Sequence, residues 1–172
     1  MSKLHRGALV VVGSMVALVA ALPIASAAPM SGAIFTTGAG CTAVNLNGYE
    51  LNADVYLSGG PSQPDAASLP DGSYWVKVTE PSGAVLGTSP GVAFSVSNGG
   101  LNVDCVQLSS ILVKGSDPDE AGFDLTTNRG DVYKVWVCDN AEFLSSGCKT
   151  DNFNSSETGS GGGGGDPPPT AS

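Results

Sequence analysis

The chain has 172 residues and carries 16 acidic side chains against 7 lysines and arginines, which gives a formal net charge of −9. A chain this acidic repels nucleic acid and anionic membrane surfaces unless its cations gather in one patch, and the sequence scatters them. The length suits one domain with a hydrophobic core of its own. We therefore expect a monomeric single domain that binds no nucleic acid.

The first 27 residues have the order of parts found in a secretory signal peptide. Lys3 and Arg6 precede an apolar run over 8–24, which leads to small residues ending at Ala27. The run is short for a bilayer crossing, so a membrane anchor is the weaker interpretation. Cleavage after Ala27 leaves five basic against sixteen acidic residues, a net charge of −11, and removes the chain's one histidine. We predict a secreted, extracellular protein that does not stay in the membrane.

Short runs of β-branched and aromatic residues, separated by turn signals, recur along the rest of the chain. We predict strands at 33–37, 41–46, 54–57, 74–79, 85–86, 92–96, 101–108 with a slip of the pleat near Cys105, 111–113, 133–137 and 150–154. No amphipathic helical period is present after residue 27. The expected fold is all-β, an antiparallel β-sandwich over residues 28–154, followed by a disordered Gly/Pro-rich tail over 155–172.

Four cysteines in an exported chain indicate two disulfides. Three pairings are formally possible. Cys138 and Cys148 are joined by a short loop, and pairing them leaves Cys41 with Cys105. A structural zinc site is the rival use, but the sequence has no Cys-x-x-Cys spacing.

Two of the predicted strands each carry a tryptophan and a lysine on the face opposite to their apolar residues. If the strands 74–79 and 133–137 are neighbours in one sheet, their side chains share an outward face. This possible ligand face consists of Trp75, Lys77, Lys134 and Trp136. It could stack sugar rings or dock a partner, and the competing interpretation is that a loop or the terminal segment covers it.

A Gly-x-Ser-x-Gly pattern at 87–91 resembles the nucleophile motif of serine hydrolases, but its chemistry does not fit. The mechanism needs a histidine base, which the mature chain lacks, and a backbone N–H after the serine, where Pro90 has none. A hydrolase that uses carboxylates alone remains an alternative, although no spacing singles out two of them. We expect no enzyme activity and no cofactor.

An acidic loop offers oxygen ligands of the kind that calcium prefers. Its carboxylates belong to Asp117, Asp119, Glu120 and Asp124. The spacing does not match the EF-hand loop and the central glycine is missing, so an ordinary charged loop is the favoured interpretation.

The turn, strand and turn over 69–83 resemble those of the prealbumin-like modules, also called Cna-B-like or SdrD-B-like, of bacterial secreted and surface proteins. Together with 33–37, 54–61, 133–137 and 149–153, the chain looks like a group of uncharacterised secreted bacterial proteins. The resemblance implies a prealbumin-like, Ig-like sandwich that displays, spaces or adheres. The expected function is a non-catalytic extracellular or cell-surface module of structural or adhesion type, whose partner is a glycan or a protein. The alternative within binding proteins is a carbohydrate-binding module that uses Trp75 and Trp136.

Overall fold

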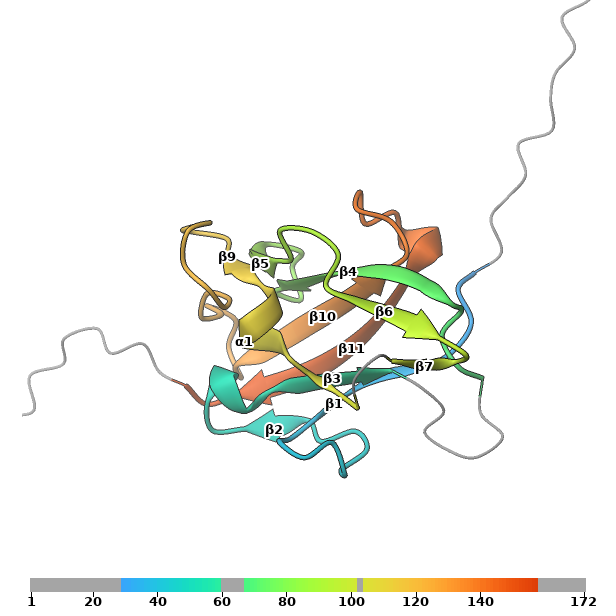
Figure 1. The fold of residues 1–172 in the computed structure, drawn as a ribbon. Helices are drawn as coiled ribbons and strands as arrows, with labels where there is room; N and C mark the ends of the chain where they lie inside the picture. Colours follow the sequence, from blue (N-terminus) through green and yellow to red (C-terminus); the bar gives the residue numbers. More distant parts are fainter. Residues whose placement is uncertain (1–28, 60–66, 102–103, 158–172) are drawn as a thin grey trace, which may run out of the picture.

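The computed structural model describes residues 29–59, 67–101 and 104–157, and these residues form mostly strands (Figure 1). The predicted signal segment 1–27 lies outside the described residues. The strands are β1 (Ile34–Thr37), β2 (Gly48–Tyr49), β3 (Tyr56–Gly59), β4 (Gly72–Thr79), β5 (Val85–Thr88), β6 (Phe94–Ser97), β7 (Gly100–Leu101), β8 (Val106–Gln107), β9 (Val113–Lys114), β10 (Val132–Cys138) and β11 (Cys148–Ser155). The described helical elements are α1 (Leu108–Ile111) and two 3₁₀ turns, η1 (Asn52–Asp54) and η2 (Ser145–Gly147).

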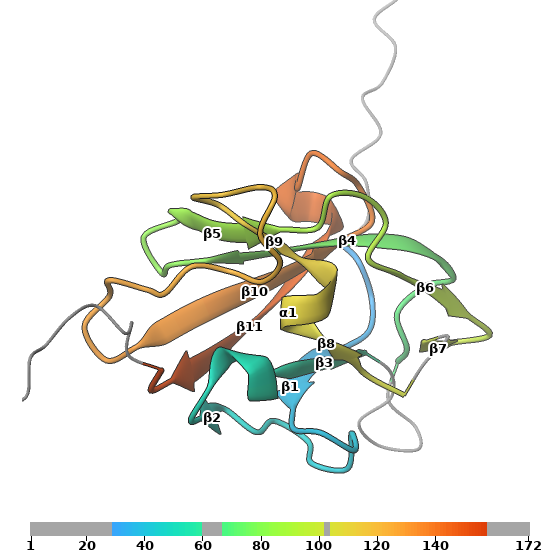
Figure 2. The same cartoon turned by 60° about the vertical axis from the view of Figure 1, so that its left-hand side comes forward.

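The strands form two sheets. The larger sheet has the order β2-β11-β10-β4-β5-β9, and β6 pairs with the first half of β4 and with β7. The smaller sheet has the order β1-β3-β8. Every pairing between named strands is antiparallel except that of β2 with β11. Figure 2, turned from the view of Figure 1, shows α1 following β8 and leading to β9, so this turn of helix connects the two sheets.

The two sheets share one hydrophobic core, which follows from the period-two pattern of the central strands. Alternate residues of β4 and β10 are buried, and they join Val55 and Leu57 from the η1–β3 segment in one cluster. The Tyr133 and Phe153 rings stack in this core with their centroids 5.0 Å apart. The residues buried from the central strands are Tyr74, Val76, Val78, Tyr133, Val135 and Val137.

Both predicted disulfides are confirmed. Cys138 and Cys148 lie directly opposite each other on β10 and β11, with their Cα atoms 4.1 Å apart. Cys41 and Cys105 have their Cα atoms 5.7 Å apart and are only half-buried. This second bridge therefore lies at the surface, where it ties the loop after β1 to the segment before β8.

The predicted strand at 41–46 is wrong. Cys41 and Asn45 have φ angles of 59° and 55°, and such left-handed conformations interrupt the extended backbone that pairing requires. The segment forms turns instead, and β2 begins only at Gly48.

The segment at 111–113 also departs from the predicted strand, because the chain forms one helical turn over Leu108–Ile111 before β9 begins. Leu108 and Leu112 are both buried, and their spacing of four residues matches one helical turn. A single turn is too short to produce a recognisable helical period in the sequence.

The described residues continue past residue 154, where the sandwich domain was predicted to end. Ser155 ends β11, and the Glu157 carboxylate accepts a hydrogen bond from the Asn52 backbone N–H at 2.6 Å. Residues 158–172, the remainder of the predicted tail, lie outside the described residues. Within the part of the chain that the structure describes, no helix has the length and apolar character needed to span a membrane.

Candidate functional site

The structure brings together all four residues of the predicted ligand face. Strands β4 and β10 are neighbours, with Trp136 directly opposite Lys77 and Trp75 directly opposite Cys138. Opposite residues of an antiparallel pair share a face, so both tryptophans and both lysines point away from the core. All four are half-buried. The expectation that the two strands are adjacent is therefore confirmed, and the face is partly accessible.

The lysines of this face lie against aromatic rings. The Lys77 Nζ lies 4.9 Å from the centre of the Trp136 ring and 4.7 Å from that of Phe143, and the Lys134 Nζ lies 5.2 Å from the Trp136 ring. These distances are typical of cation–π contacts, which contribute about 0.5–1 kcal/mol each at exposed sites. Burial lowers the pKa of the Lys77 ammonium from its ordinary value, because desolvation disfavours the charged form.

Neither lysine of this face pairs with a carboxylate of the residues that the structure describes. The one salt bridge among the described residues joins Lys114 to Glu120, away from β4 and β10. The ammonium groups of Lys77 and Lys134 therefore keep N–H donors that the described chain does not occupy.

The indole N–H of Trp136 donates a hydrogen bond to the Thr79 Oγ1 at 3.1 Å. Thr79 lies directly opposite Lys134 and so belongs to the same face. The residue is nevertheless only 1% exposed. The bond places the indole against Thr79, which explains this burial and removes the N–H of Trp136 from use by a partner.

Phe143 completes the face, and sequence reasoning missed it. It lies in the loop 139–147, which the Cys138–Cys148 disulfide closes. Cys138 has the same parity along β10 as Trp136, so the closed loop starts and ends on the outward face. The parity of Cys138 in the sequence could therefore have indicated that the loop lies beside Trp136.

The conformation of the loop 139–147 places Phe143 on this face. The backbone of Phe143 is left-handed, with φ of 54°, and the Asn140 side-chain oxygen accepts the Leu144 N–H at 2.9 Å. We call Trp75, Lys77, Lys134, Trp136 and Phe143 the aromatic–lysine face.

The carboxylates of the acidic loop do not gather around one point. Glu120 pairs with Lys114, Asp124 accepts hydrogen bonds from Ser116, and Asp117 accepts the Asp119 N–H. Among the described residues, no three His, Cys, Asp or Glu side chains come together as a metal site would need. The carboxylates of Asp117, Glu120 and Asp124 are each engaged by a group of the loop or of β9.

The Gly-x-Ser-x-Gly segment has a structural role in the sheet. Ser89 is buried, its N–H donates to the Val76 carbonyl at 2.8 Å, and its Oγ accepts the Val76 N–H at 3.1 Å. Gly87 lies in β5 so close to Phe123 that a Cβ there would stand 2.7 Å from the Phe123 Cβ. The pattern extends the pairing of β4 with β5 and does not present a nucleophile.

No family model, no curated protein and no solved structure matches this chain. The functional interpretation therefore rests on the geometry described above.

Proposed function

We propose that this protein is a secreted, non-catalytic recognition module of adhesion type, and that it binds an acidic extracellular glycan with the aromatic–lysine face. The proposal includes a prealbumin-like sandwich arrangement of the two sheets. Export is supported by the signal-like order of residues 1–27 and by two disulfides, which persist in oxidising compartments.

The observation that carries the proposal is the position of the Lys77 ammonium between two aromatic rings without a carboxylate beside it. Aromatic rings attract the charge but accept no strong hydrogen bonds, so the N–H groups of the ammonium still favour an oxygen acceptor. A carboxylate or sulfate on a glycan supplies such an acceptor. Trp75, half-exposed two residues away along β4, adds a flat apolar surface for a sugar ring.

The charge of the rest of the molecule is consistent with a local contact of this kind. The chain as a whole is acidic, so a polyanion is repelled except where two lysines lie together. Salt screens this long-range repulsion beyond about 8 Å at physiological ionic strength. We therefore expect an acidic glycan to bind at the aromatic–lysine face rather than elsewhere on the acidic surface.

Affinity electrophoresis through gels that contain a polyuronate or a neutral glucan tests the proposal. We expect retardation by the polyuronate, reduced about tenfold in affinity by Lys77→Gln and by Trp75→Ala. Lys149→Gln is the matched control. It removes the same charge from β11, at the position opposite Val137 and outside the aromatic–lysine face, and should change little. Equal retardation of wild type and Lys77→Gln would contradict the proposal, as would retention by the neutral glucan alone.

A further inference from the structure

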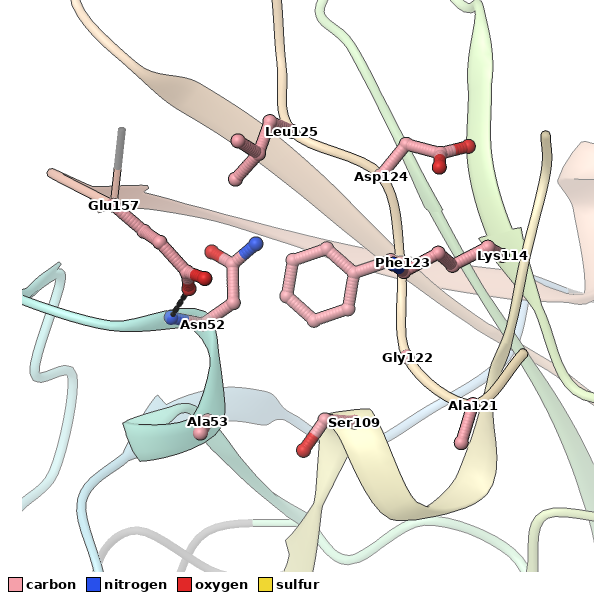
Figure 3. A pocket seen from close by; sticks show the side chains of 10 residues that line it. All are labelled: Asn52, Ala53, Ser109, Lys114, Ala121, Gly122, Phe123, Asp124, Leu125 and Glu157. Carbon is pink, nitrogen blue, oxygen red and sulfur yellow. Dashed lines mark hydrogen bonds between the residues drawn. The ribbon is translucent and has the colours of Figure 1, made fainter. Parts of the chain in front are cut away.

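A second candidate site is a hollow of about 450 Å³ between η1, α1, β9 and the loop over 121–125. It shares no residue with the aromatic–lysine face. Its volume lies in the lower part of the range of small-molecule sites, about 300–1,000 Å³. Figure 3 shows the lining residues, which are Asn52, Ala53, Ser109, Lys114, Ala121, Gly122, Phe123, Asp124, Leu125 and Glu157.

Asn52 is the polar residue that distinguishes this hollow from a packing defect. Its side chain is only 7% exposed, and its Oδ1 is fully buried without a hydrogen-bond partner among the described residues. In Figure 3 the amide points into the space between Glu157, Phe123 and Leu125. Buried polar groups are almost always paired, so an amide oxygen that the described residues leave unpaired indicates a partner from outside them.

The side chain of Asn52 has no evident role in stabilising η1. The residue before the turn, Leu51, has no side chain that could cap it, and the Asn52 backbone N–H is already taken by the Glu157 carboxylate. A half-turn about the last bond of the side chain exchanges the carbonyl and amino ends of an amide. The Asn52 amide can therefore offer either an acceptor or a donor to a molecule in the hollow.

The charges around the hollow disfavour an anion. Two carboxylates, those of Asp124 and Glu157, line it, and the ammonium of Lys114 is neutralised by Glu120. The Asp124 carboxylate is engaged by Ser116, whereas the Glu157 carboxylate accepts one hydrogen bond and has lone pairs to spare. The hollow therefore suits a molecule that brings hydroxyl donors and carries no negative charge.

Apart from Ser109, the remaining lining is apolar and comes mainly from the loop that closes the hollow. Ala121, Phe123 and Leu125 lie on this loop, and Ala53 lies across from them on η1. Phe123 is held in place by edge-on contacts with the Tyr133 and Phe153 rings, whose centroids lie 5.6 and 6.0 Å from its own. A rigid apolar wall facing a buried amide and a carboxylate matches the two kinds of surface that a sugar ring presents.

We propose that this hollow binds a small, neutral, polyhydroxylated molecule of the size of one sugar ring. Adjacent hydroxyl groups of the ring bond to the Asn52 amide and the Glu157 carboxylate, while its C–H face packs on the loop 121–125. The inference goes beyond the proposed function, since it concerns a different site and a ligand of different charge.

Ligand-observed NMR with the intact protein tests the proposal, using glucose, galactose, mannose and N-acetylglucosamine as neutral probes. Glucuronate and choline serve as the anionic and cationic probes. We expect at least one neutral sugar to bind, with about tenfold lower affinity in Asn52→Ala, because that variant leaves a ligand hydroxyl unpaired. Lys77→Gln, in the aromatic–lysine face, should bind the same sugar as wild type does, so failure of one site is distinguishable from failure of the other.

Thermal unfolding of the Asn52→Ala variant separates a ligand-binding role from a structural one. An amide without a partner contributes no hydrogen bond to stability, so Asn52→Ala should unfold at or above the wild-type temperature in the absence of sugar. Glu157→Gln keeps the acceptor for the Asn52 N–H and provides a second variant if alanine disturbs the turn. It should keep the fold and weaken sugar binding. The proposal is overturned if no neutral sugar binds, if choline alone binds, or if Asn52→Ala binds as wild type does.

Discussion

Lys77 and Trp136 occupy directly opposite positions on β4 and β10, and the lysine Nζ lies 4.9 Å from the centre of the indole ring. The ring of Phe143, from the loop 139–147 that follows β10, lies 4.7 Å from the same nitrogen. The charge of Lys77 is thus held between two rings on the outward side of the sheet. The contacts of Lys77 can therefore be tested by measuring the free energy of unfolding of variants and its dependence on pH.

The titration of Lys77 provides the first prediction. Its pKa is lowered by burial, so between that value and the ordinary lysine pKa of about 10.4 the unfolded chain binds more protons than the folded one. Through this group, stability should therefore rise with pH in that window, and the burial penalty is fully present below it. Lys77→Met removes the effect. The check is urea unfolding of wild type and Lys77→Met from about pH 8.5 to about pH 10.5. A difference in stability that does not change with pH would show that Lys77 is not desolvated.

The second prediction concerns Phe143. Phe143→Ala removes the ring over Lys77 and should lower the free energy of unfolding by about 0.5–1 kcal/mol. Leu144→Ala is the matched control, because the Leu144 side chain is 61% exposed and belongs to the same loop. It should change stability by less than about 0.5 kcal/mol. Urea denaturation followed by tryptophan fluorescence measures both. Equal effects of the two substitutions would indicate that the loop only covers the sheet and that Lys77 gains nothing from the ring.

The third prediction is that the two disulfides differ in their contribution to stability. The bridge between Cys138 and Cys148 closes a loop with a sequence separation of 10, and that between Cys41 and Cys105 closes one of 64. Loop-closure entropy gives about 3 kcal/mol for the first and about 4 kcal/mol for the second. Replacing each pair by alanines and measuring unfolding by urea tests this order. Loss of the short bridge should also free Phe143 from Lys77, so the Phe143→Ala effect should shrink in that background.

The fourth prediction compares two glycines of the Gly-x-Ser-x-Gly segment. A Cβ at Gly87 would lie 2.7 Å from the Phe123 Cβ and 3.0 Å from the Gly122 carbonyl oxygen, whereas a Cβ at Gly91 meets nothing within 4 Å. Gly87→Ala should therefore cost about 1–3 kcal/mol through overpacking. Gly91→Ala should be neutral or stabilise the protein by up to about 1 kcal/mol, because it restricts the unfolded chain. Thermal unfolding of both variants checks this. Similar tolerance of the two changes would mean that β5 and the loop at Phe123 are not packed as described.

Several features of this protein could be predicted because their signals are local. The period-two alternation of 74–79 and 133–137 identified which side chains of β4 and β10 are buried and which point outward. The short loop between Cys138 and Cys148 indicated the disulfide pairing. Alternation along one strand and the length of one loop depend on neighbouring residues, so the amino-acid sequence alone carries them.

Other features depend on segments that meet only in the folded chain. The left-handed backbone at Cys41 and Asn45, in a loop held by the bridge to Cys105, replaced a predicted strand. The position of Phe143 over Lys77 depends on how a closed loop folds back on the sheet. The contact of Asn52 with Glu157 joins residues separated by 105 positions, and no local pattern specifies it. Sequence thus determined the central strands β4 and β10, their buried sides and the covalent links of this protein. Packing between distant segments decided which side chains face a partner, because only the assembled core sets those positions.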